Sequence, residues 1–311
     1  MSVRLIDHLK SLGLTPREAR RALSSGKVSL NSVPTADAGR LVDPERIRYD
    51  ERAPRLRVGV DPAVVWRDDH LAVVWKPAGL LSVAAPRRGK DPNLVSLMAR
   101  LFGEAHPVHR LDEGTSGLII VARSAKVRQA MIPKFAAHEI ERGYLALVQQ
   151  TFPDKPLTVR NTIVADRGDG RRGAGEGPGG VTAATHFRRV AVLQKSASLV
   201  EARLETGRKH QVRIHLAELG YPVLGDNRYG QRRSTMRARR LALHAYRLGF
   251  KHPVTNEQLS FEAPLADDLE HLMRVLNGQE APPPPRKPRA KPVPASQRKK
   301  ARQKKNRRKR K

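Results

Sequence analysis

One short segment combines a lone carboxylate, an arginine and two glycines in front of an apolar run. In "HRLDEGTSGLIIVA", residues 109–122, Asp112 follows Arg110 by two positions and precedes Gly114 and Gly117. On an extended backbone, side chains two apart share one face, and the glycines leave room for a substrate beside them. A carboxylate among cations is expected to stay ionised at neutral pH, which suits a nucleophile or a base. The same segment also fits a structural Asp that caps a turn or pairs with an arginine.

Other reactive sets are missing from the sequence or have the wrong spacing. The chain has no cysteine, which excludes a thiolate nucleophile and a cysteine zinc site. His210 and His215 are five residues apart in "HQVRIH" and do not form the helical His-Glu-x-x-His pattern. The glycine-rich residues 165–181 lack the Lys-Ser or Lys-Thr of a phosphate-binding loop and indicate a loop insertion. We therefore expect chemistry by ordinary side chains, with no metal site.

The charge of the chain points to a polyphosphate partner. The 311 residues carry a formal net charge of +30, from 60 Lys and Arg against 30 Asp and Glu. Residues 281–311 hold 15 of the Lys and Arg and no acid, which predicts a disordered basic tail that binds phosphates by counterion release. Removing these 15 charges leaves +15 on residues 1–280, so RNA or DNA is the expected partner with or without the tail.

The sequence offers no signal for secretion or for a membrane. No stretch approaches the roughly 18 consecutive apolar residues of a membrane span, and charges interrupt the apolar positions of the N-terminal segment. Together with the missing cysteines, this predicts a cytoplasmic protein without a membrane partner. A monomer is the default expectation for its oligomeric state.

The chain divides into three predicted parts: residues 1–58, 59–277 and 278–311. The first part predicts a helix over "VRLIDHLKSLG", a second helix capped by Thr15, and a hairpin with an Asn-containing turn. The pattern "TPREARRALSSGKVSLNS" resembles the αL RNA-binding motif of ribosomal and RNA-modifying proteins. The resemblance implies that Arg17, Arg20 and Arg21 contact RNA, although a basic helix face is also common as plain solvated surface. The central part mixes β-rich and helical runs and predicts an α+β domain.

Four motifs of the central part resemble the RluA-type pseudouridine synthases, which isomerise chosen uridines of ribosomal or transfer RNA. They are "VVWRDDHLAVVWKPAGLLSV", "HRLDEGTSGLIIVAR", "RGYLALV" and "LETGRKHQVRIHLAELGYPVLGDNRYG". The second fits the family signature at every fixed position, and the order of the motifs also agrees. The resemblance implies a mixed, mainly antiparallel sheet with flanking helices and no cofactor. Two departures are Gly143, where a basic residue is frequent, and the glycine-rich loop.

The resemblance assigns roles to individual residues. Asp112 corresponds to the catalytic aspartate, which attacks carbon 1 of the ribose or the uracil ring. Tyr144 corresponds to the tyrosine that stacks on the base. Arg213 corresponds to the arginine that pairs with the aspartate. Arg110 corresponds to the residue that enters the space of the flipped base. The remaining predicted RNA contacts are His109, Arg208, Lys209 and His210, and Leu243 is a candidate for the apolar wall.

Three points stay open at the level of sequence. The target is ribosomal RNA, most naturally of the large subunit, or transfer RNA. A non-catalytic ribosome-assembly factor would explain the basic N-terminal part and the tail, but not the intact motifs. A hydrolase that releases the base would need a second carboxylate to activate water, and Asp226 in "LGDNRYG" is the nearest candidate.

Overall fold

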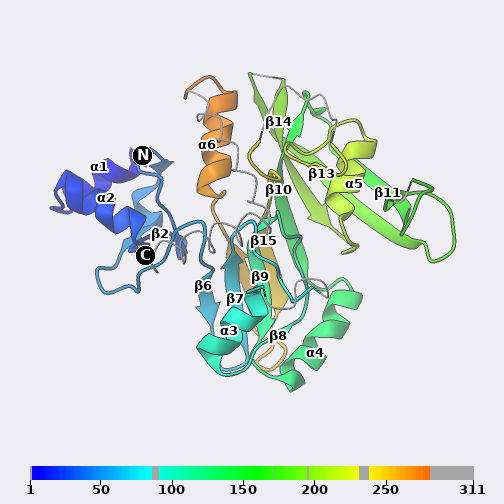
Figure 1. Ribbon diagram of the computed structural model, residues 1–311, viewed down its shortest axis with the longest axis horizontal. Coiled ribbons are helices and arrows are strands. Elements are labelled where there is room, and N and C mark those ends of the chain that lie inside the picture. The colour runs from blue at the N-terminus through cyan, green and yellow to red at the C-terminus, as the bar shows by residue number, and fades with distance from the viewer. Residues whose placement is uncertain (1, 86–90, 170, 195, 231–237, 281–311) are drawn as a thin grey trace, which may run out of the picture. The chain divides into compact units, whose positions relative to one another are not determined.

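The computed structural model describes residues 2–85, 91–169, 171–194, 196–230 and 238–280. Of the predicted tail, residues 281–311 lie outside the described residues. The chain up to Glu280 forms one compact unit (Figure 1). Within the described residues, no helix is both long enough and apolar enough to cross a membrane.

The N-terminal part has a small core of its own. Its elements are β1 (Val3–Arg4), α1 (Leu5–Ser11), α2 (Pro16–Ser24), β2 (Val28–Leu30), β3 (Val33–Pro34), β4 (Leu41–Val42), the 3-10 helix η1 (Pro44–Arg46) and β5 (Ile47–Tyr49). Thr15 and Glu18 form a reciprocal capping box that begins α2, as the Thr-Pro start predicts. Asn31 and Ser32 both have positive φ, which is the two-residue turn that joins β2 to β3. Leu5, Leu9 and Leu23 are buried between these elements.

A long mixed sheet dominates the rest of the described chain. Its path runs β12-β11-β13-β14-β10-β15-β9-β7-β6, with β16 paired to β15 and β8 to β9. The strands are β6 (Ala63–Arg67), β7 (Leu71–Lys76), β8 (His106–Pro107), β9 (Ser116–Ala122), β10 (Glu141–Gln149), β11 (Leu157–Val164), β12 (Gly173–Ala174), β13 (Val181–Leu193), β14 (Ala197–Leu204), β15 (Leu243–Lys251) and β16 (Gln258–Glu262). Of these described pairs, β15 with β9 is parallel and the others are antiparallel. The predicted α+β class and the mixed, mainly antiparallel sheet are confirmed.

Helices cover both faces of β7 and β9, which explains why every residue of these strands is buried. α3 (Leu94–Phe102) packs Leu94 and Met98 on the face that carries Ile119 and Val121. α4 (Ala125–Ala136) packs on the opposite face, where Ile120 lies. Strands that are apolar on both sides read in the sequence as continuous hydrophobic runs, as "SGLIIVA" does.

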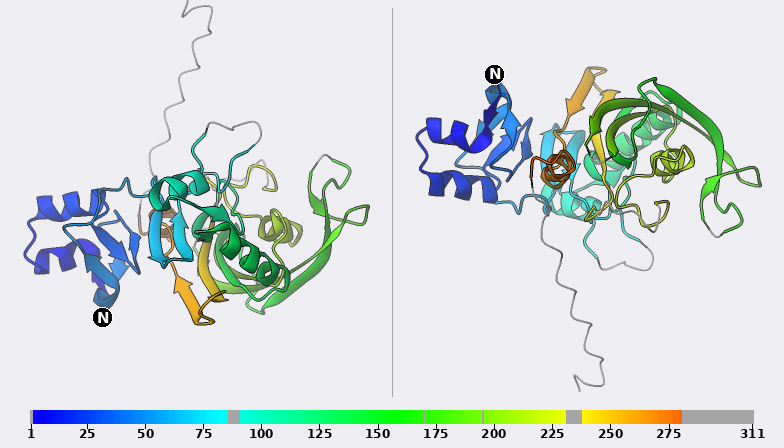
Figure 2. Two further views of the ribbon diagram at one scale, coloured as in Figure 1. Left: turned by 90° about the horizontal axis from the view of Figure 1, so that it is seen from below. Right: turned by 90° about the horizontal axis from the view of Figure 1, so that it is seen from above.

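The other half of the sheet curves around a short helix. α5 (Gln211–Glu218) lies against the concave side of β13 and β11 (Figure 2), where Ile214 packs on Ile163 and Ala183. This packing turns the opposite side of α5 toward residues 109–112, which we call the HRLD loop. The glycine-rich residues 165–181, predicted as a plain loop, contribute the short strand β12 to the sheet edge.

Gly117 sits where the parallel pair β9 and β15 approach each other. Its φ is +118°, and a Cβ at this position would lie 2.1 Å from the carbonyl oxygen of Ala245. Only glycine fits such a contact. The TSG end of the motif therefore sets the junction between the two halves of the sheet, directly after the loop that holds Asp112.

The last helix carries ion pairs to the N-terminal part. α6 (Asp267–Leu276) presents Asp267 and Glu270 to the guanidinium of Arg40, each at 3.3 Å, and Arg40 also donates to the Leu265 carbonyl at 2.9 Å. Arg274 of α6 pairs with Asp37 at 2.7 Å.

One predicted detail was wrong: Val3 and Arg4 form β1 rather than the first turn of α1.

Candidate active site

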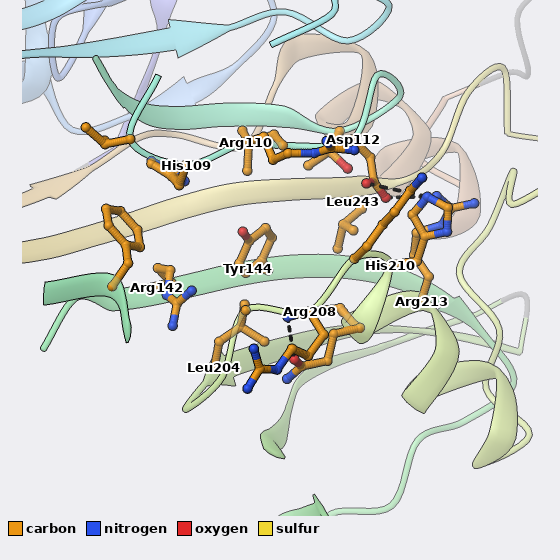
Figure 3. Close-up of a pocket in the computed structure, with 18 of the residues that line it drawn as sticks. His109, Arg110, Asp112, Arg142, Tyr144, Leu204, Arg208, His210, Arg213 and Leu243 are labelled. Atoms are coloured by element: carbon orange, nitrogen blue, oxygen red, sulfur yellow. Dashed lines mark hydrogen bonds and ion pairs between the residues drawn. The ribbon is translucent and has the colours of Figure 1, made fainter. Parts of the chain in front are cut away.

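A cavity of about 690 Å³ lies beside the HRLD loop, within the roughly 300–1,000 Å³ typical of ligand pockets. Its walls come from that loop, from β10, from β15 and from the chain between the end of β14 and α5. Figure 3 shows side chains from all of these segments facing one space. Asp112, Tyr144 and Arg213 line it together, although they lie far apart in the sequence.

Arg213 holds the carboxylate of Asp112. Its Nη1 donates to Asp112 Oδ2 at 2.8 Å, which connects the first turn of α5 to the HRLD loop. Both side chains are largely buried, and a charge-assisted hydrogen bond in such surroundings is strong and directional. The pairing that the sequence motif implied for these two residues is therefore present.

Asp226 holds Arg213 from the other edge of the guanidinium. Its two carboxylate oxygens accept from Nε at 2.7 Å and from Nη2 at 2.9 Å. The backbone amides of Arg228 and Tyr229 also donate to Asp226 Oδ1. Burial opposes the charges of both groups, but these bonds lower the pKa of Asp226 and raise the pKa of Arg213.

The position of Asp226 argues against the hydrolase alternative. Its side chain is 1% exposed and both of its oxygens are occupied by Arg213. A carboxylate that activates water must face the substrate with a free oxygen. Asp226 fixes the orientation of Arg213 instead.

His210 lies beside Asp112 as a neutral side chain. Burial, with the charges of Arg213 and Lys209, lowers the pKa of His210 to about 4, against the attraction of Asp112. Its Nε2 is 3.7 Å from Asp112 Oδ1, too long for a hydrogen bond, and its Nδ1 is 2.9 Å from the Tyr229 hydroxyl. His210 has a left-handed φ of 62°, which lets the chain turn into α5. His215 faces away, between Thr185 and Asn161, so the two histidines do not converge.

Buried polar groups fix the HRLD loop. The Lys76 ammonium donates to the carbonyls of Pro77, Leu80 and Glu113 at 3.0, 2.8 and 3.3 Å, and burial lowers the pKa of Lys76 to about 7. Ser82 Oγ donates to the Leu111 carbonyl and accepts from the Leu111 amide. The residues on both sides of Asp112 are thus bound to residues 76–82 of the first motif, which explains why the two motifs occur together.

Tyr144 and Leu243 form the apolar wall opposite this loop. Tyr144 projects from β10 and Leu243 from the start of β15, and both line the cavity (Figure 3). Burial raises the pKa of Tyr144 to about 12, so its hydroxyl stays protonated at neutral pH. A protonated phenol on an apolar ring suits stacking on a base with a donor at its edge.

The predicted RNA contacts separate into three groups. Arg110, Arg208 and Lys209 line the cavity and are exposed. His109 lines it too, but its Nε2 accepts from the Ile120 amide at 2.9 Å and its ring stacks on Phe135, so it also anchors the loop to β9. The remaining three, Arg17, Arg20 and Arg21, are exposed on α2 and are not among the residues that line this cavity.

Two residues at the site were not predicted from the sequence. Tyr229 lies under Arg213, with the guanidinium carbon 5.1 Å from the ring centroid. Arg142 is buried in the wall of the cavity. Tyr229 belongs to "LGDNRYG" with Asp226, and Arg142 is the first residue of "RGYLALV", so the available signal for both residues was their place in these motifs.

The chain is similar in sequence to known RNA pseudouridine synthases. Residues 70–218 match the family model described as RNA pseudouridylate synthase. The chain is 38% identical over 239 residues to ribosomal large subunit pseudouridine synthase D of Zymomonas mobilis, covering 68% of this chain and 72% of the relative. It is 34% identical over 200 residues to the dual-specificity RNA pseudouridine synthase RluA of Haemophilus influenzae, covering 64% and 91%.

A solved structure supports the fold. The human RNA pseudouridylate synthase domain containing 1 superposes with a TM-score of 0.57 at 24% identity, covering 73% of this chain and 98% of that one. The chain therefore belongs to the RluA-type RNA pseudouridylate synthase family and is an RNA pseudouridine synthase, an isomerase.

Proposed function

We propose that this enzyme converts specific uridines of large-subunit ribosomal RNA to pseudouridine, with Asp112 as the nucleophile. The observation that carries the proposal is the carboxylate of Asp112, held by Arg213 at the cavity into which Tyr144 projects. Relatives named for the large ribosomal subunit favour this RNA over transfer RNA.

The chemistry needs only the side chains at hand. Asp112 attacks carbon 1 of the ribose or the uracil ring, and the bond between the base and the sugar breaks. The freed uracil turns within the cavity and its carbon 5 bonds to carbon 1 of the ribose, while the bond to Asp112 breaks and returns the carboxylate. The proton lost from carbon 5 is balanced by one gained at N1 of the base. Arg213 neutralises the carboxylate when it is released, and Tyr144 and Leu243 retain the base on an apolar surface.

Access to the glycosidic bond requires that the uridine leave its stack. Arg110 is exposed at the edge of the cavity, two residues before Asp112. A planar guanidinium stacks on bases and binds phosphates, so Arg110 suits the space that the flipped base leaves. The N-terminal part, with Arg17, Arg20 and Arg21 on one exposed helix face, adds RNA contacts outside the cavity as a separate binding domain.

Mapping of pseudouridines in ribosomal and transfer RNA from cells with and without the gene tests the proposal. We expect individual uridines of large-subunit RNA to lose their modification in the deletion and regain it with a plasmid copy. Loss in transfer RNA alone would replace the proposed target by the alternative one. Unchanged maps in both RNA classes would contradict the proposal and favour a non-catalytic factor.

A further inference from the structure

Arg142 is a buried cation with no counter-charge among the residues that the structure describes. It is 8% exposed, and within the described part of the chain no carboxylate forms an ion pair with it. Its Nη2 donates to the Glu205 carbonyl at 3.3 Å, and its Nε has no hydrogen-bond partner among the described residues. An arginine stays charged in proteins, and a buried charge is costly unless it is paired. The charge of Arg142 therefore needs a partner that the described residues do not supply.

The cavity beside Arg142 is positively charged. Asp112 is the single carboxylate among the described residues that line it, and Arg213 already holds that group. Arg110, Arg208 and Lys209 add positive charges to the same lining. Burial, together with the charge of Arg208, lowers the pKa of Arg142. An anion that enters this cavity thus meets several cations and no free acid.

The chain around Arg142 holds its guanidinium in place and leaves it room. The guanidinium carbon lies 5.7 Å from the centre of the Phe135 ring. A Cβ on Gly207 would lie 2.2 Å from Arg142 Nη1, so any other residue there would require the guanidinium to move from its present place. Figure 3 shows Arg142 and Arg208 on the same side of Tyr144, with Asp112 on the other.

We propose that Arg142, together with Arg208, binds a phosphodiester group of the RNA next to the flipped uridine. The inference rests on the proposed function, because it takes RNA as the occupant of the cavity. A guanidinium donates two parallel hydrogen bonds to phosphate oxygens and supplies the charge that a uracil carbonyl does not need. Arg142 precedes Tyr144 by two residues on β10, about 7 Å along a strand, so the phosphate and the base are held by one strand.

The competing explanation is purely structural: Arg142 packs on Phe135 and bonds the Glu205 carbonyl to fix the loop before α5. Both explanations predict that removal of the side chain affects the protein. They differ in whether the effect depends on one particular charge of the RNA.

The test is a double-mutant cycle that combines Arg142→Met in the protein with the removal of one phosphodiester charge at a time from the RNA. The probe is a synthetic oligonucleotide that spans the uridine found by mapping, with each flanking phosphodiester replaced in turn by a methylphosphonate. Affinity is measured in an Asp112→Asn background, so that turnover does not interfere. Arg203→Met is the control for a general loss of charge. Arg203 is an exposed arginine of β14, the strand next to β10, and it pairs with Glu201 of the same strand.

We expect one neutral linkage to weaken binding about 10-fold or more to the protein with Arg142 and to have no effect on Arg142→Met, as for a charge-assisted pair. In otherwise wild-type enzyme, Arg142→Met raises KM and leaves kcat within a few-fold. Should Arg142→Met not fold, Arg142→Lys serves: it is expected to keep its sensitivity to the same linkage.

The inference would be overturned if each neutral linkage changed RNA affinity equally with and without the Arg142 side chain. It would also be overturned if no linkage changed the affinity of the Arg142→Lys protein. These outcomes leave the proposed function intact, because it is judged separately by whether the wild-type enzyme forms pseudouridine in the same oligonucleotide.

Discussion

Arg213 Nη1 donates to Asp112 Oδ2 at 2.8 Å while the other edge of the same guanidinium is clamped by both oxygens of Asp226. The clamp fixes the plane of the guanidinium, and in this orientation Nη1 donates to the proposed nucleophile. Because the amides of Arg228 and Tyr229 hold Asp226, the orientation of Asp112 depends on a chain of bonds that begins in the loop after α5.

Asp226→Asn tests this chain of bonds. The amide cannot accept from both nitrogens of Arg213, so the guanidinium is free to turn away from Asp112. We expect kcat for pseudouridine formation to fall roughly 100-fold, as for an ångström-scale misplacement of a reacting group. RNA affinity should stay within a few-fold. Asp69→Asn, whose side chain is fully exposed, is the matched control, and single-turnover kinetics is the measurement. An Asp226→Asn enzyme with wild-type kcat would show that the clamp is dispensable.

Buried neutral histidines make stability depend on pH. Burial lowers the pKa of His244 to about 3 and that of His215 to about 4. Between about pH 4 and 6.5 the unfolded chain binds protons at these positions and the folded chain does not, so stability falls as the pH falls. Each fully buried histidine contributes a slope of about 1.4 kcal/mol per pH unit in this window.

Urea unfolding across that range, with wild type and His244→Gln, measures the effect. The glutamine is expected to reduce the slope of the unfolding free energy against pH whatever its effect at neutral pH. Parallel curves for the two proteins would mean that His244 is protonated in the folded state.

Arg40→Met is expected to destabilise the contact between the N-terminal part and the segment around α6. Arg40 is 8% exposed and bonds Leu265, Asp267 and Glu270, so its loss leaves two partly buried acids with fewer partners. We expect a cost of about 3 kcal/mol and faster proteolysis in the segment after residue 49. Arg48→Met, at an exposed position of β5, is the control. Equal unfolding free energies for the two variants would show that the Arg40 contacts add little.

Gly117→Ala and Gly103→Ala separate close packing from backbone strain. Both glycines have positive φ, but nothing lies within 4 Å of a Cβ on Gly103, whereas one on Gly117 meets the Ala245 backbone. We expect about 1–2 kcal/mol for Gly103→Ala from strain alone. Gly117→Ala should cost well above that, because the β9 and β15 backbones must separate. Chemical denaturation of both variants checks the difference, and similar values would refute the role given to the TSG glycine.

Much of the fold was predictable because strands buried on both faces and capped helices leave strong local patterns. "SGLIIVA" and "HLAVVWK" became β9 and β7, and the Thr15 cap and the Asn31 turn formed where the sequence indicated them. The pair of Asp112 and Arg213 was implied by the family motifs, since 101 residues separate the two and no periodicity links them. The division at residue 58, the cytoplasmic location and the monomeric state stay predictions.

Tertiary contacts decided what the sequence did not indicate. Asp226 looked like a possible second acid, and only its two bonds to Arg213 show that it is a clamp. Arg142 opens the "RGYLALV" motif, but its burial beside Gly207 is a tertiary contact that the motif does not report. The strand β12 forms within a glycine-rich run because β11 supplies its partner, a contact that local propensity does not report.

The measurement that tests the account most directly is pseudouridine formation by purified Asp112→Asn protein on the RNA identified by mapping. The amide keeps the size of the side chain and an acceptor for Arg213, but it is not a nucleophile. We predict that the variant binds the RNA within a few-fold of wild type and forms no pseudouridine. Pseudouridine produced by the variant at a rate near that of wild type would contradict the assignment of Asp112.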